Sequence, residues 1–281
     1  MEILLGKTIS EKVRKRLRLQ VSKLARAPKL VIIQVGDLPE SNKYIEMKKL
    51  FGTSVGVTVM HKKYPKSISM KALEADLEKF NKDKFIQGII IQLPIPKHLD
   101  IGRLTSLIAP EKDVDCLTPI NIKHLFNGRE VFLPATTRGI LTLFKHKKIS
   151  LKGKEVVMVG ESLLVGRPTF LALVNRGATV TVCHAHTKNL AQKTQKAEIL
   201  ISATGRPKLI GKEHVSKGQI VVDVGFNVDK KGRLSGDVDF DNVKGRVRMI
   251  TPVPGGVGPL TVASLFENLL DSGKMPPHKR D

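Results

Sequence analysis

The feature of this sequence that most constrains its fold is a regular alternation of short apolar runs with longer helical patterns. Apolar runs lie at residues 29–36 (KLVIIQVG), 55–64 (VGVTVMHKKY) and 86–96 (IQGIIIQLPIP). The segments between them place apolar residues at helical spacing, as in MKALEADLEKFNKD at residues 70–83. This β-α-β-α-β order predicts a parallel sheet with right-handed crossover helices.

The alternation restarts in the second half of the chain. A helical pattern at 136–147 precedes a strand, a glycine-bearing loop and a helix within 152–177. Further strands are expected within 178–187, 197–205 and 218–227. The predicted fold class is therefore α/β, with two α/β domains.

The domain boundaries follow from where the pattern restarts. We expect the first domain to comprise residues 1–120 and to be completed by a final helix at 260–273. The second domain is expected to comprise residues 121–259, and the polar tail at 274–281 is expected to be disordered.

The first helix is predicted from a capping box, in which Thr8 is the N-cap and Glu11 follows three residues later. Its buried face is predicted from apolar residues at helical spacing: Ile9, Val13, Leu17, Val21 and Leu24. Pro28 ends this pattern.

The composition raises the question of an anionic partner. The chain has 281 residues and a formal net charge of +22, from 48 Lys and Arg against 26 Asp and Glu. The basic residues are spread along the chain, and only 2 Tyr and no Trp are present, so a base-stacking surface for nucleic acid is not expected. A solvated basic surface that attracts small anions is the favoured interpretation.

Other partner and location classes are also disfavoured. No apolar run approaches the ~20 residues that a membrane span requires. No secretory signal is apparent, so a cytoplasmic location is expected. Cys116 and Cys183 lie far apart and lack metal-ligand spacing, so neither a disulfide framework nor a metal site is expected.

A glycine-bearing loop, VGESLLVGRP, follows the strand expected near 155–159. Gly160 and Gly166 allow the backbone to turn closely, as at the pyrophosphate site of a dinucleotide at a helix N-terminus. The spacing differs from G-x-G-x-x-G, so a tight turn without a ligand is an alternative. Gly205 and Gly225 follow two later strands, and together these glycines favour a dinucleotide.

The segment YIEMK contains the strongest catalytic candidate. At 100° per residue, Lys48 falls on one broad helical arc with Tyr44, Ile45, Met47, Leu50 and Phe51, whereas Glu46 and Lys49 point to solvent. A lysine on the apolar side loses its proton more easily because burial disfavours the charge, and it can then act as an acid or base. A lysine that reaches solvent along an apolar face is the alternative.

Three further segments carry polar or glycine-rich patterns that could form a site together with this lysine. Gln92 ends a buried strand and could hold the lysine by a hydrogen bond. Asp113 and Asp115 lie in a loop, where a carboxylate could bind a heterocycle or form an Asx-turn. The segment TPVPGGVGPLT at 251–261 could approach a ligand closely or be an ordinary loop before the last helix.

These motifs together resemble the bifunctional methylenetetrahydrofolate dehydrogenase/methenyltetrahydrofolate cyclohydrolase family. The resemblance rests on VGDLPESNKYIEMKK, GIIIQLPIP, PEKDVDCL, VGESLLVGRP, AEILISATGRP, VVDVGFN, GDVDF and TPVPGGVGPLT, and it runs from about residue 1 to about residue 272. It implies a folate-binding catalytic domain, a Rossmann-like NAD(P)-binding domain, a cleft between them and a homodimer. It also implies oxidation of 5,10-methylenetetrahydrofolate with NAD(P)⁺ and hydrolysis of the methenyl product to 10-formyltetrahydrofolate.

The resemblance also implies roles for individual residues. Lys48 is implied to be the catalytic lysine, with Tyr44, Gln92 and Asp115 as the other catalytic residues. The same four are implied to bind the folate together with Leu93, Pro94, Pro254, Gly255, Gly256, Val257 and Gly258. The dinucleotide contacts are implied to be Thr136, Gly160, Glu161, Ser162, Val165, Gly166, Ala185, Gly205 and Phe226. No metal is implied.

The sequence departs from the family pattern at the expected site of the NADP 2′-phosphate. Many members have arginine where this chain has Glu161, and serine or arginine where it has Ala185. An acidic residue favours a free ribose, so NAD is slightly favoured over NADP. A basic group formed by His184, His186, Lys188 and Arg206 could still bind a phosphate.

Two other departures concern loop geometry. Cys116 stands where glycine is usual, and Ala135 and Thr137 replace the usual cysteine and proline. The first could alter the loop beside the folate, and the others could loosen the connection between domains. Neither change removes a group that the resemblance assigns to chemistry.

Three rival interpretations arise, and the order of the motifs along the chain excludes the first. The Y-x-x-x-K spacing also occurs in short-chain dehydrogenases, but there it follows the glycine loop, whereas Tyr44 and Lys48 precede Gly160. A nucleic-acid-binding protein would use the net charge of +22. A monofunctional dehydrogenase of the same family is the third possibility.

Overall fold

The fold is described from a computed structural model, which describes residues 1–228 and 233–272. The chain forms two compact units. The three-stranded unit comprises Lys12–Ala135 and the chain from Val262 onward, and the six-stranded unit comprises Met1–Glu11 and Thr136–Thr261. These units group the first eleven residues with the second half of the chain, whereas the sequence analysis placed them in the first domain. The expected disorder of 274–281 lies outside the described residues.

The three-stranded unit confirms the predicted β-α-β-α-β order. Its parallel sheet has the strand order β3-β2-β4. The strands are β2 (Lys29–Val35), β3 (Thr58–Tyr64) and β4 (Gly88–Ile91). The helices assigned wholly to this unit are α2 (Pro39–Val55), α3 (Met70–Lys82), α4 (Ile101–Leu107) and α5 (Pro119–Phe126).

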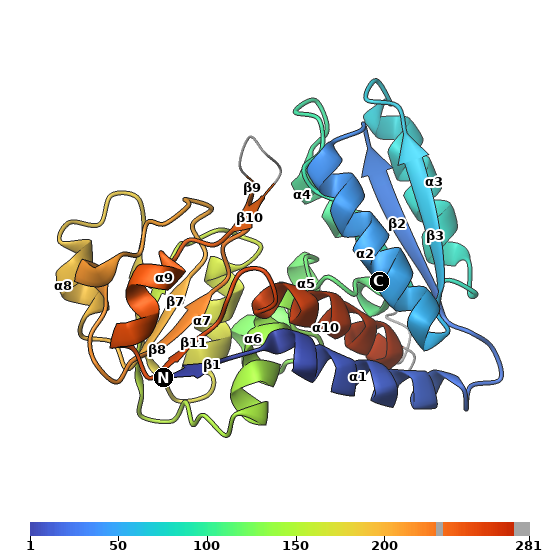
Figure 1. The fold of residues 1–281 in the computed structure, drawn as a ribbon. Coiled ribbons are helices and arrows are strands. Elements are labelled where there is room, and N and C mark those ends of the chain that lie inside the picture. The colour runs from blue at the N-terminus through green and yellow to red at the C-terminus, as the bar shows by residue number, and fades with distance from the viewer. Residues whose placement is uncertain (229–232, 273–281) are drawn as a thin grey trace. The chain divides into compact units, whose positions relative to one another are not determined.

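Both faces of this sheet are covered at β2 and β4, which explains why these two strands read as continuous apolar runs. Leu30, Ile32 and Ile90 pack with Ile45 of α2 and with apolar residues of α1 (Gly6–Val21) and α10 (Val257–Ser272). Val31 and Ile33 face the opposite side, where α3 and α4 cover them (Figure 1). Because the three strands are parallel, their carboxyl ends lie at one edge of the sheet. The helix that carries Lys48, α2, follows β2 in the chain.

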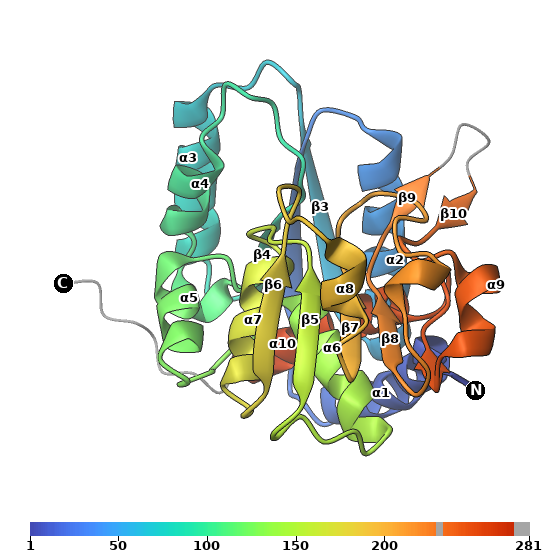
Figure 2. The same ribbon diagram turned by 90° about the vertical axis from the view of Figure 1, so that its left-hand side faces the viewer.

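The six-stranded unit has a second parallel sheet, with the order β1-β11-β8-β7-β5-β6 among the described residues. Figure 2 shows β8, β7, β5 and β6 of this sheet. Its strands are β1 (Glu2–Ile3), β5 (Glu155–Val159), β6 (Thr179–Cys183), β7 (Ile199–Ser202), β8 (Ile220–Asp223) and β11 (Met249–Ile250). The short antiparallel pair consists of β9 (Asn227–Val228) and β10 (Leu234–Ser235). The helices are α6 (Ala135–His146), α7 (Gly166–Val174), α8 (Leu190–Thr194) and α9 (Phe240–Val243).

Two apolar layers cover this sheet. On one face, Met158 and Ile201 of the strands pack with Phe144 of α6 and Leu260 of α10. On the other face, Leu200 packs with residues around α8 and α9, including Ala197, Val215, Val238 and Val243. The predicted α/β architecture of the second half, with strands β5, β6, β7 and β8 in parallel, is confirmed.

The first helix differs from its prediction at both ends. It begins at Gly6, two residues before Thr8, so the predicted N-cap at Thr8 is wrong. The backbone at Gly6 packs so closely on the carbonyl of Gly256 that a Cβ would clash, and Lys7 N–H donates to the carbonyl of Gly255 at 3.0 Å. These contacts start the helix without the predicted cap.

The predicted buried face of this helix is largely confirmed. Ile9, Val13, Leu17 and Val21 are buried. Leu24 is 49% exposed because the helix ends at Val21, so its predicted place in the core is wrong. The last helix, α10, begins at Val257, three residues earlier than predicted, and ends at Ser272 within the described residues.

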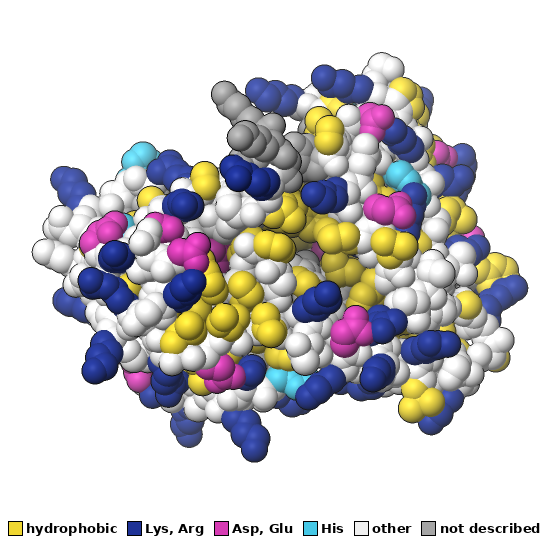
Figure 3. Space-filling model, in the orientation of Figure 1, with side chains coloured by type: hydrophobic (Ala, Val, Ile, Leu, Met, Phe, Trp, Pro, Cys, Tyr) yellow, Lys and Arg dark blue, Asp and Glu magenta, His cyan; other side chains and the backbone are white. Residues whose placement is uncertain are grey.

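Basic side chains are spread over the face of the molecule that Figure 3 shows. Lys and Arg occur across the face drawn in Figure 3, interspersed with acidic and apolar side chains. Among the described residues, no helix is long and apolar enough to cross a membrane.

Candidate active site

Lys48 and Gln92 form the first contact of the candidate site. Lys48 Nζ donates to Gln92 Oε1 at 2.9 Å, while Gln92 Nε2 donates to the carbonyl of Leu93 at 2.9 Å. Gln92 N–H donates to the carbonyl of Ile33 in the neighbouring strand. The second bond fixes which side of the amide carries oxygen, so the oxygen faces the lysine. The predicted hydrogen bond between Gln92 and Lys48 is confirmed.

A carboxylate faces the same lysine. Burial lowers the pKa of Lys48, and the negative charge of Asp115 raises it in part. Burial likewise raises the pKa of Asp115, which the charge of Lys48 opposes. Each group therefore depends on the other to remain charged, and a change at one alters the proton affinity of the other.

Tyr44 lies one helical turn before Lys48 on α2 and is half-buried. Burial raises the pKa of its hydroxyl to about 12. The phenol therefore keeps its proton at neutral pH and presents an apolar ring rather than a charge.

The helical arc predicted for α2 is partly wrong. Ile45 is buried, but Met47 is 38% exposed and Leu50 is 64% exposed. Glu46 is exposed and forms an ion pair with Lys49, as expected for the solvent side. The apolar stripe is thus narrower than the sequence indicated, and Lys48 lies half-buried at its margin.

The structure separates the two aspartates of the KDVD segment. Asp113 Oδ1 accepts from Leu117 N–H, and Asp113 Oδ2 accepts from Thr118 N–H and Asn121 Nδ2. Asp113 thus has the turn-forming role that the sequence left open for either residue. Asp115 instead lies close enough to Lys48 for the two charges to affect each other's pKa.

A residue missed by sequence reasoning holds this segment. Asn268 of α10 donates from Nδ2 to the carbonyls of Val114 and Leu133, at 2.8 Å each. It lies 154 residues from Val114 in the chain. A polar residue within the apolar pattern of the last helix was the only sign of this contact in the sequence.

The glycine–proline segment belongs to the six-stranded unit. Gly255 has φ +102°, and a Cβ at Gly256 would clash with the carbonyl oxygen of Pro252. Val257 is buried in the first turn of α10, whereas Pro254 and Gly258 are exposed. The close-approach backbone expected here is therefore present from 252 to 256, and a helix begins after it.

The loop after β5 turns as closely as predicted. Gly160 has φ +111°, and a Cβ there would clash with the carbonyl oxygen of Ala203, in the loop after β7. A Cβ at Gly166 would clash with the carbonyl oxygen of Gly160. Ser162 Oγ accepts from the N–H groups of Val165 and Gly166, at 3.3 Å each, and so begins α7.

Glu161 has a basic partner in the first turn of α7. Arg167 Nε donates to the Glu161 carbonyl at 3.2 Å, and its guanidinium lies 3.8 Å from the carboxylate. Ala185 is exposed in a tight turn, in which His184 N–H donates to Thr187 Oγ1 and His186 N–H donates to His184 Nδ1. Arg167 was not among the basic residues considered from the sequence.

The remaining predicted dinucleotide residues occupy three other loops or helices. Thr136 accepts a hydrogen bond from Thr261 Oγ1 at 3.3 Å. Gly205 has φ +67° and open space where a Cβ would lie, and Phe226 is half-buried directly before β9. Thr137, one of the departures from the family pattern, is buried and exchanges a hydrogen bond with Thr169 at 2.9 Å.

Within the described residues, no group of three or more His, Cys, Asp or Glu side chains could hold a metal ion.

Two family models match the chain. Residues 4–115 match "Tetrahydrofolate dehydrogenase/cyclohydrolase, catalytic domain", and residues 134–276 match "Tetrahydrofolate dehydrogenase/cyclohydrolase, NAD(P)-binding domain". The chain belongs to the tetrahydrofolate dehydrogenase/cyclohydrolase family.

Similar proteins extend this result over nearly the full chain. The Bifunctional protein FolD of Nautilia profundicola is 43% identical over 277 residues, which cover 98% of each chain. The crystal structure of the bifunctional enzyme FolD from Campylobacter jejuni is 40% identical, with a TM-score of 0.95 and coverage of 98% of this chain and 99% of that one. A Trypanosoma brucei relative, solved with NADP and an inhibitor, is 33% identical, with a TM-score of 0.92 and 97% coverage of each chain.

The family assignment divides the predicted site residues into two groups. Tyr44, Lys48, Gln92 and Asp115 lie within the catalytic-domain match. The loops at 160–166 and 252–258 lie within the NAD(P)-binding match. The structure brings Lys48, Gln92 and Asp115 of this family member together within the three-stranded unit.

Proposed function

We propose that this protein oxidises 5,10-methylenetetrahydrofolate to 5,10-methenyltetrahydrofolate with NAD(P)⁺ and hydrolyses the product to 10-formyltetrahydrofolate. The observation that carries the proposal is Lys48, half-buried with its ammonium on Gln92 and facing Asp115, in a chain of this family. The 43% identity to a bifunctional protein over 98% of the chain supports both activities rather than the dehydrogenase alone.

The close backbone turns of the six-stranded unit are suited to binding a dinucleotide. Gly160 and Gly166 leave no room for side chains where the β5–α7 turn closes, and Gly205 leaves open space after β7. These loops follow the carboxyl ends of parallel strands, which is where such sheets bind nucleotides. When bound, NAD(P)⁺ supplies the acceptor for a hydride from the one-carbon bridge.

Lys48 is proposed to act on the folate. Hydrolysis of the methenyl group requires water to add to a cationic carbon and protons to move as the ring opens. Because burial lowers the pKa of Lys48, this lysine gives up and takes back a proton more readily than an exposed lysine. Gln92 holds its rotamer, and Asp115 tunes its charge and is proposed to bind the pterin.

Tyr44 and the glycine–proline segment complete the proposed folate site. The protonated, half-buried ring of Tyr44 is suited to pack against the substrate. Leu93 and Pro94 directly follow Gln92 in the chain, and the close-approach backbone around Gly255 and Gly256 is also proposed to bind folate, as the resemblance implies.

The main test is a spectrophotometric assay of both half-reactions. Purified protein is expected to form methenyltetrahydrofolate only when a nicotinamide dinucleotide is present, and to hydrolyse added methenyltetrahydrofolate without one. Oxidation without hydrolysis would support the monofunctional alternative. Absence of both reactions, together with salt-sensitive binding of RNA or DNA, would replace the proposal with a nucleic-acid-binding function.

We further propose that NAD is preferred over NADP. The carboxylate of Glu161 is suited to a ribose hydroxyl and repels a 2′-phosphate, and Ala185 offers no donor. Arg167 offsets this repulsion in part, because its guanidinium lies 3.8 Å from the carboxylate. The preference is tested by comparing kcat/KM with NAD⁺ and NADP⁺, and a large preference for NADP⁺ would contradict it.

A homodimer is also proposed, as the family resemblance implies. Strand β6 is at an edge of the six-stranded sheet among the described residues, and Val174 at the end of α7 is 51% exposed. Such an edge can pair with a second copy. Light scattering after size-exclusion chromatography tests this, and a monomer at micromolar concentration would contradict it.

We also propose a cytoplasmic location, which cell fractionation tests. The free thiols of the buried Cys116 and Cys183 agree with a reducing compartment.

A further inference from the structure

Two buried carboxylates join three loops of the six-stranded unit. Asp223 ends β8 and Asp237 follows β10, and they are 3% and 0% exposed. The loops are those after β7, after β8 and after β10. Because β7 and β8 are parallel neighbours, with Ser202 paired to Asp223, the first two loops leave the sheet at one edge.

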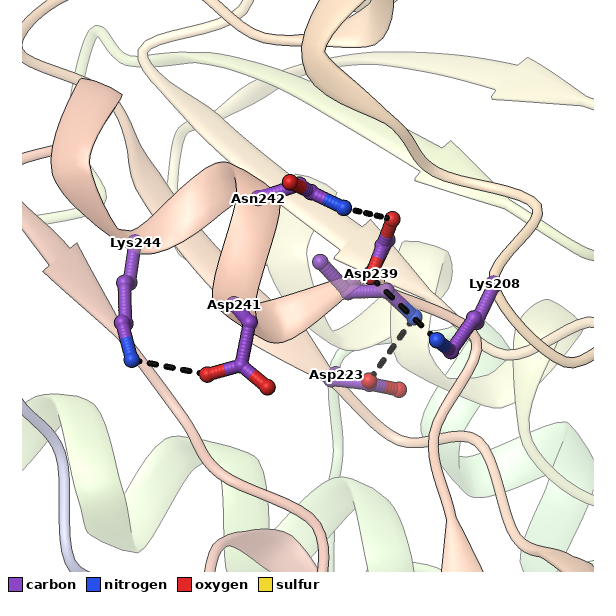
Figure 4. A network of polar contacts seen from close by, with 7 residues as sticks. Lys208, Asp223, Asp239, Asp241, Asn242 and Lys244 are labelled. Atoms are coloured by element: carbon purple, nitrogen blue, oxygen red, sulfur yellow. Dashed lines mark hydrogen bonds and ion pairs between the residues drawn. The ribbon is translucent and has the colours of Figure 1, made fainter.

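Asp223 fixes the backbone that carries Asp237. Asp223 Oδ1 accepts from the N–H groups of Gly225 and Asp237, at 2.8 and 3.0 Å, and Oδ2 accepts from Val238 N–H at 2.9 Å. Figure 4 shows the Asp223 carboxylate in this part of the unit. The position of Asp237 therefore depends on Asp223.

The side chain of Asp237 then connects the other two loops. Its Oδ2 accepts from Thr204 N–H at 2.5 Å and from Ser202 Oγ at 3.1 Å. Its Oδ1 accepts from Asn227 Nδ2 at 3.2 Å. Thr204 directly precedes Gly205, and Asn227 directly follows Phe226, so both bonded residues adjoin predicted dinucleotide contacts.

This arrangement carries an electrostatic cost. Burial raises the pKa of Asp223 to about 6, and the negative charge of Asp237 adds to that effect although three N–H groups oppose it. Two adjacent buried carboxylates are unfavourable unless hydrogen bonds compensate. Here the compensating donors come from the loops at the ligand edge of the sheet rather than from the core.

We propose that Asp237 is a positioning residue for the dinucleotide, which holds the loop of Gly205 and the loop of Phe226 in one fixed arrangement. The inference rests on the proposed function, because it assigns the dinucleotide to these loops. The loop of Gly160 joins the same arrangement, since Gly160 packs against the carbonyl of Ala203. Asp237 acts through its neighbours and does not itself contact the reacting atoms.

The proposal distinguishes a hydrogen-bonding role from a role of charge. In Asp237→Asn, the amide oxygen can still accept from Thr204 N–H, and the amide NH₂ can donate to Asn227 if that amide turns over. In Asp237→Ala, neither loop is held. The asparagine variant should therefore bind dinucleotide within about threefold of the parent protein, whereas the alanine variant should bind at least about tenfold more weakly.

The experiment measures dissociation constants for NADH and NADPH by fluorescence titration, together with KM and kcat for each half-reaction. Asn227→Ala is the second variant, because it removes one bond of Asp237 and spares Thr204, so it remains informative if Asp237→Ala does not fold. We expect weaker dinucleotide binding in Asp237→Ala and Asn227→Ala, a raised dinucleotide KM, and unchanged hydrolysis of methenyltetrahydrofolate. Asp241→Ala is the matched control, because Asp241 is an exposed carboxylate of the same region that pairs with Lys244 (Figure 4).

Three outcomes would overturn the proposal. The first is unchanged NADH and NADPH binding in folded Asp237→Ala and Asn227→Ala. The second is equal weakening in Asp237→Asn and Asp237→Ala, which would indicate a role of charge. The third is a parallel loss of hydrolysis and oxidation with unchanged dinucleotide affinity, which would indicate a general structural role. If the parent protein binds dinucleotide but lacks both activities, the proposed function is wrong, and the titrations still test the role of Asp237. If the parent protein binds neither NADH nor NADPH, the proposed function and the role of Asp237 are both wrong.

Discussion

Two lysines in the three-stranded unit, the half-buried Lys48 and the buried Lys112, show how a desolvated ammonium can serve different purposes. Lys112 Nζ donates to three backbone carbonyls, those of Phe80, Asn81 and Asp83, at 3.0, 2.6 and 2.7 Å. Lys48 Nζ, within the described residues, donates to one oxygen, that of Gln92. Burial lowers the pKa of both.

The difference lies in the donors that remain. An ammonium has three N–H groups, and the acceptors of Lys112 occupy all of them at the C-terminal end of α3. Lys112 therefore holds the chain in place through these three hydrogen bonds. Lys48 keeps donors for another partner and faces a carboxylate that modulates its proton affinity. The contacts of a buried lysine, more than its burial, indicate whether it is structural or chemical.

The neighbouring aspartates repeat the comparison. Asp113 is surrounded by donors from Leu117, Thr118 and Asn121, whereas Asp115 faces the charge of Lys48. The four-residue segment 112–115 thus contains two structural residues, Lys112 and Asp113. It also contains Asp115, the proposed catalytic partner of Lys48.

Replacing Lys48 gives the largest expected effect. Lys48→Met should lower the rate of methenyltetrahydrofolate hydrolysis by about 10²–10⁴-fold, because the acid–base group is lost. Its melting temperature should fall only modestly, because Asp115, which loses the opposing charge of Lys48, can take up a proton instead of staying charged. Hydrolysis kinetics and thermal unfolding measure these effects. Hydrolysis within threefold of the parent rate would exclude Lys48 as the catalytic lysine.

Replacing Lys112 should produce the opposite result. Lys112→Met leaves three half-buried backbone carbonyls without their donor and should lower the free energy of unfolding by about 2–4 kcal/mol. The kcat of the folded fraction should change little. Urea unfolding and assays at low temperature measure the two quantities. A catalytic loss as large as that of Lys48→Met, at full stability, would contradict the division between the two lysines.

The aspartates provide a smaller and more selective test. Asp115→Asn removes the charge that raises the pKa of Lys48, so the lysine ionisation in the pH–rate profile of hydrolysis should move to lower pH. Asp113→Asn should leave that profile in place but cost about 1–3 kcal/mol of stability, because an amide cannot accept all three bonds. A profile that shifts in Asp113→Asn and not in Asp115→Asn would reverse the assignment.

Much of this comparison could not be read from the sequence. The strands β2 and β4 were predictable because apolar runs without alternation are typical of a doubly covered sheet. The place of Gln92 at the end of β4 followed from the same pattern. Lys112, in contrast, sits in a short polar segment, and its three acceptors are backbone carbonyls that no side-chain pattern reveals.

The limits of prediction are similar at the helix ends and in the second unit. Thr8 and Glu11 have the spacing of a capping box, but packing of Gly6 against Gly256, 250 positions later in the chain, starts the helix earlier. Asp237 lies in the GDVDF motif, yet its partners Thr204 and Asn227 come from two other loops. Local spacing predicts elements and strand ends, whereas contacts between distant backbone segments require the folded chain.

The smallest expected effect concerns Cys116, which directly follows the segment of the two aspartates. Cys116 has φ +58°, a conformation that glycine adopts without strain and that costs other residues roughly 1 kcal/mol. Its buried thiol contacts the carbonyl of Phe132 at 3.5 Å, so Cys116→Gly relieves strain but loses packing. The two effects should nearly cancel, leaving a change below about 1 kcal/mol in the free energy of unfolding and an unchanged pH–rate profile. Urea unfolding and the hydrolysis profile test this together. A shifted pH–rate profile in Cys116→Gly would mean that the strained turn itself sets the position of Asp115 relative to Lys48. Cys116 would then belong with the residues that affect the chemistry and not with the structural ones.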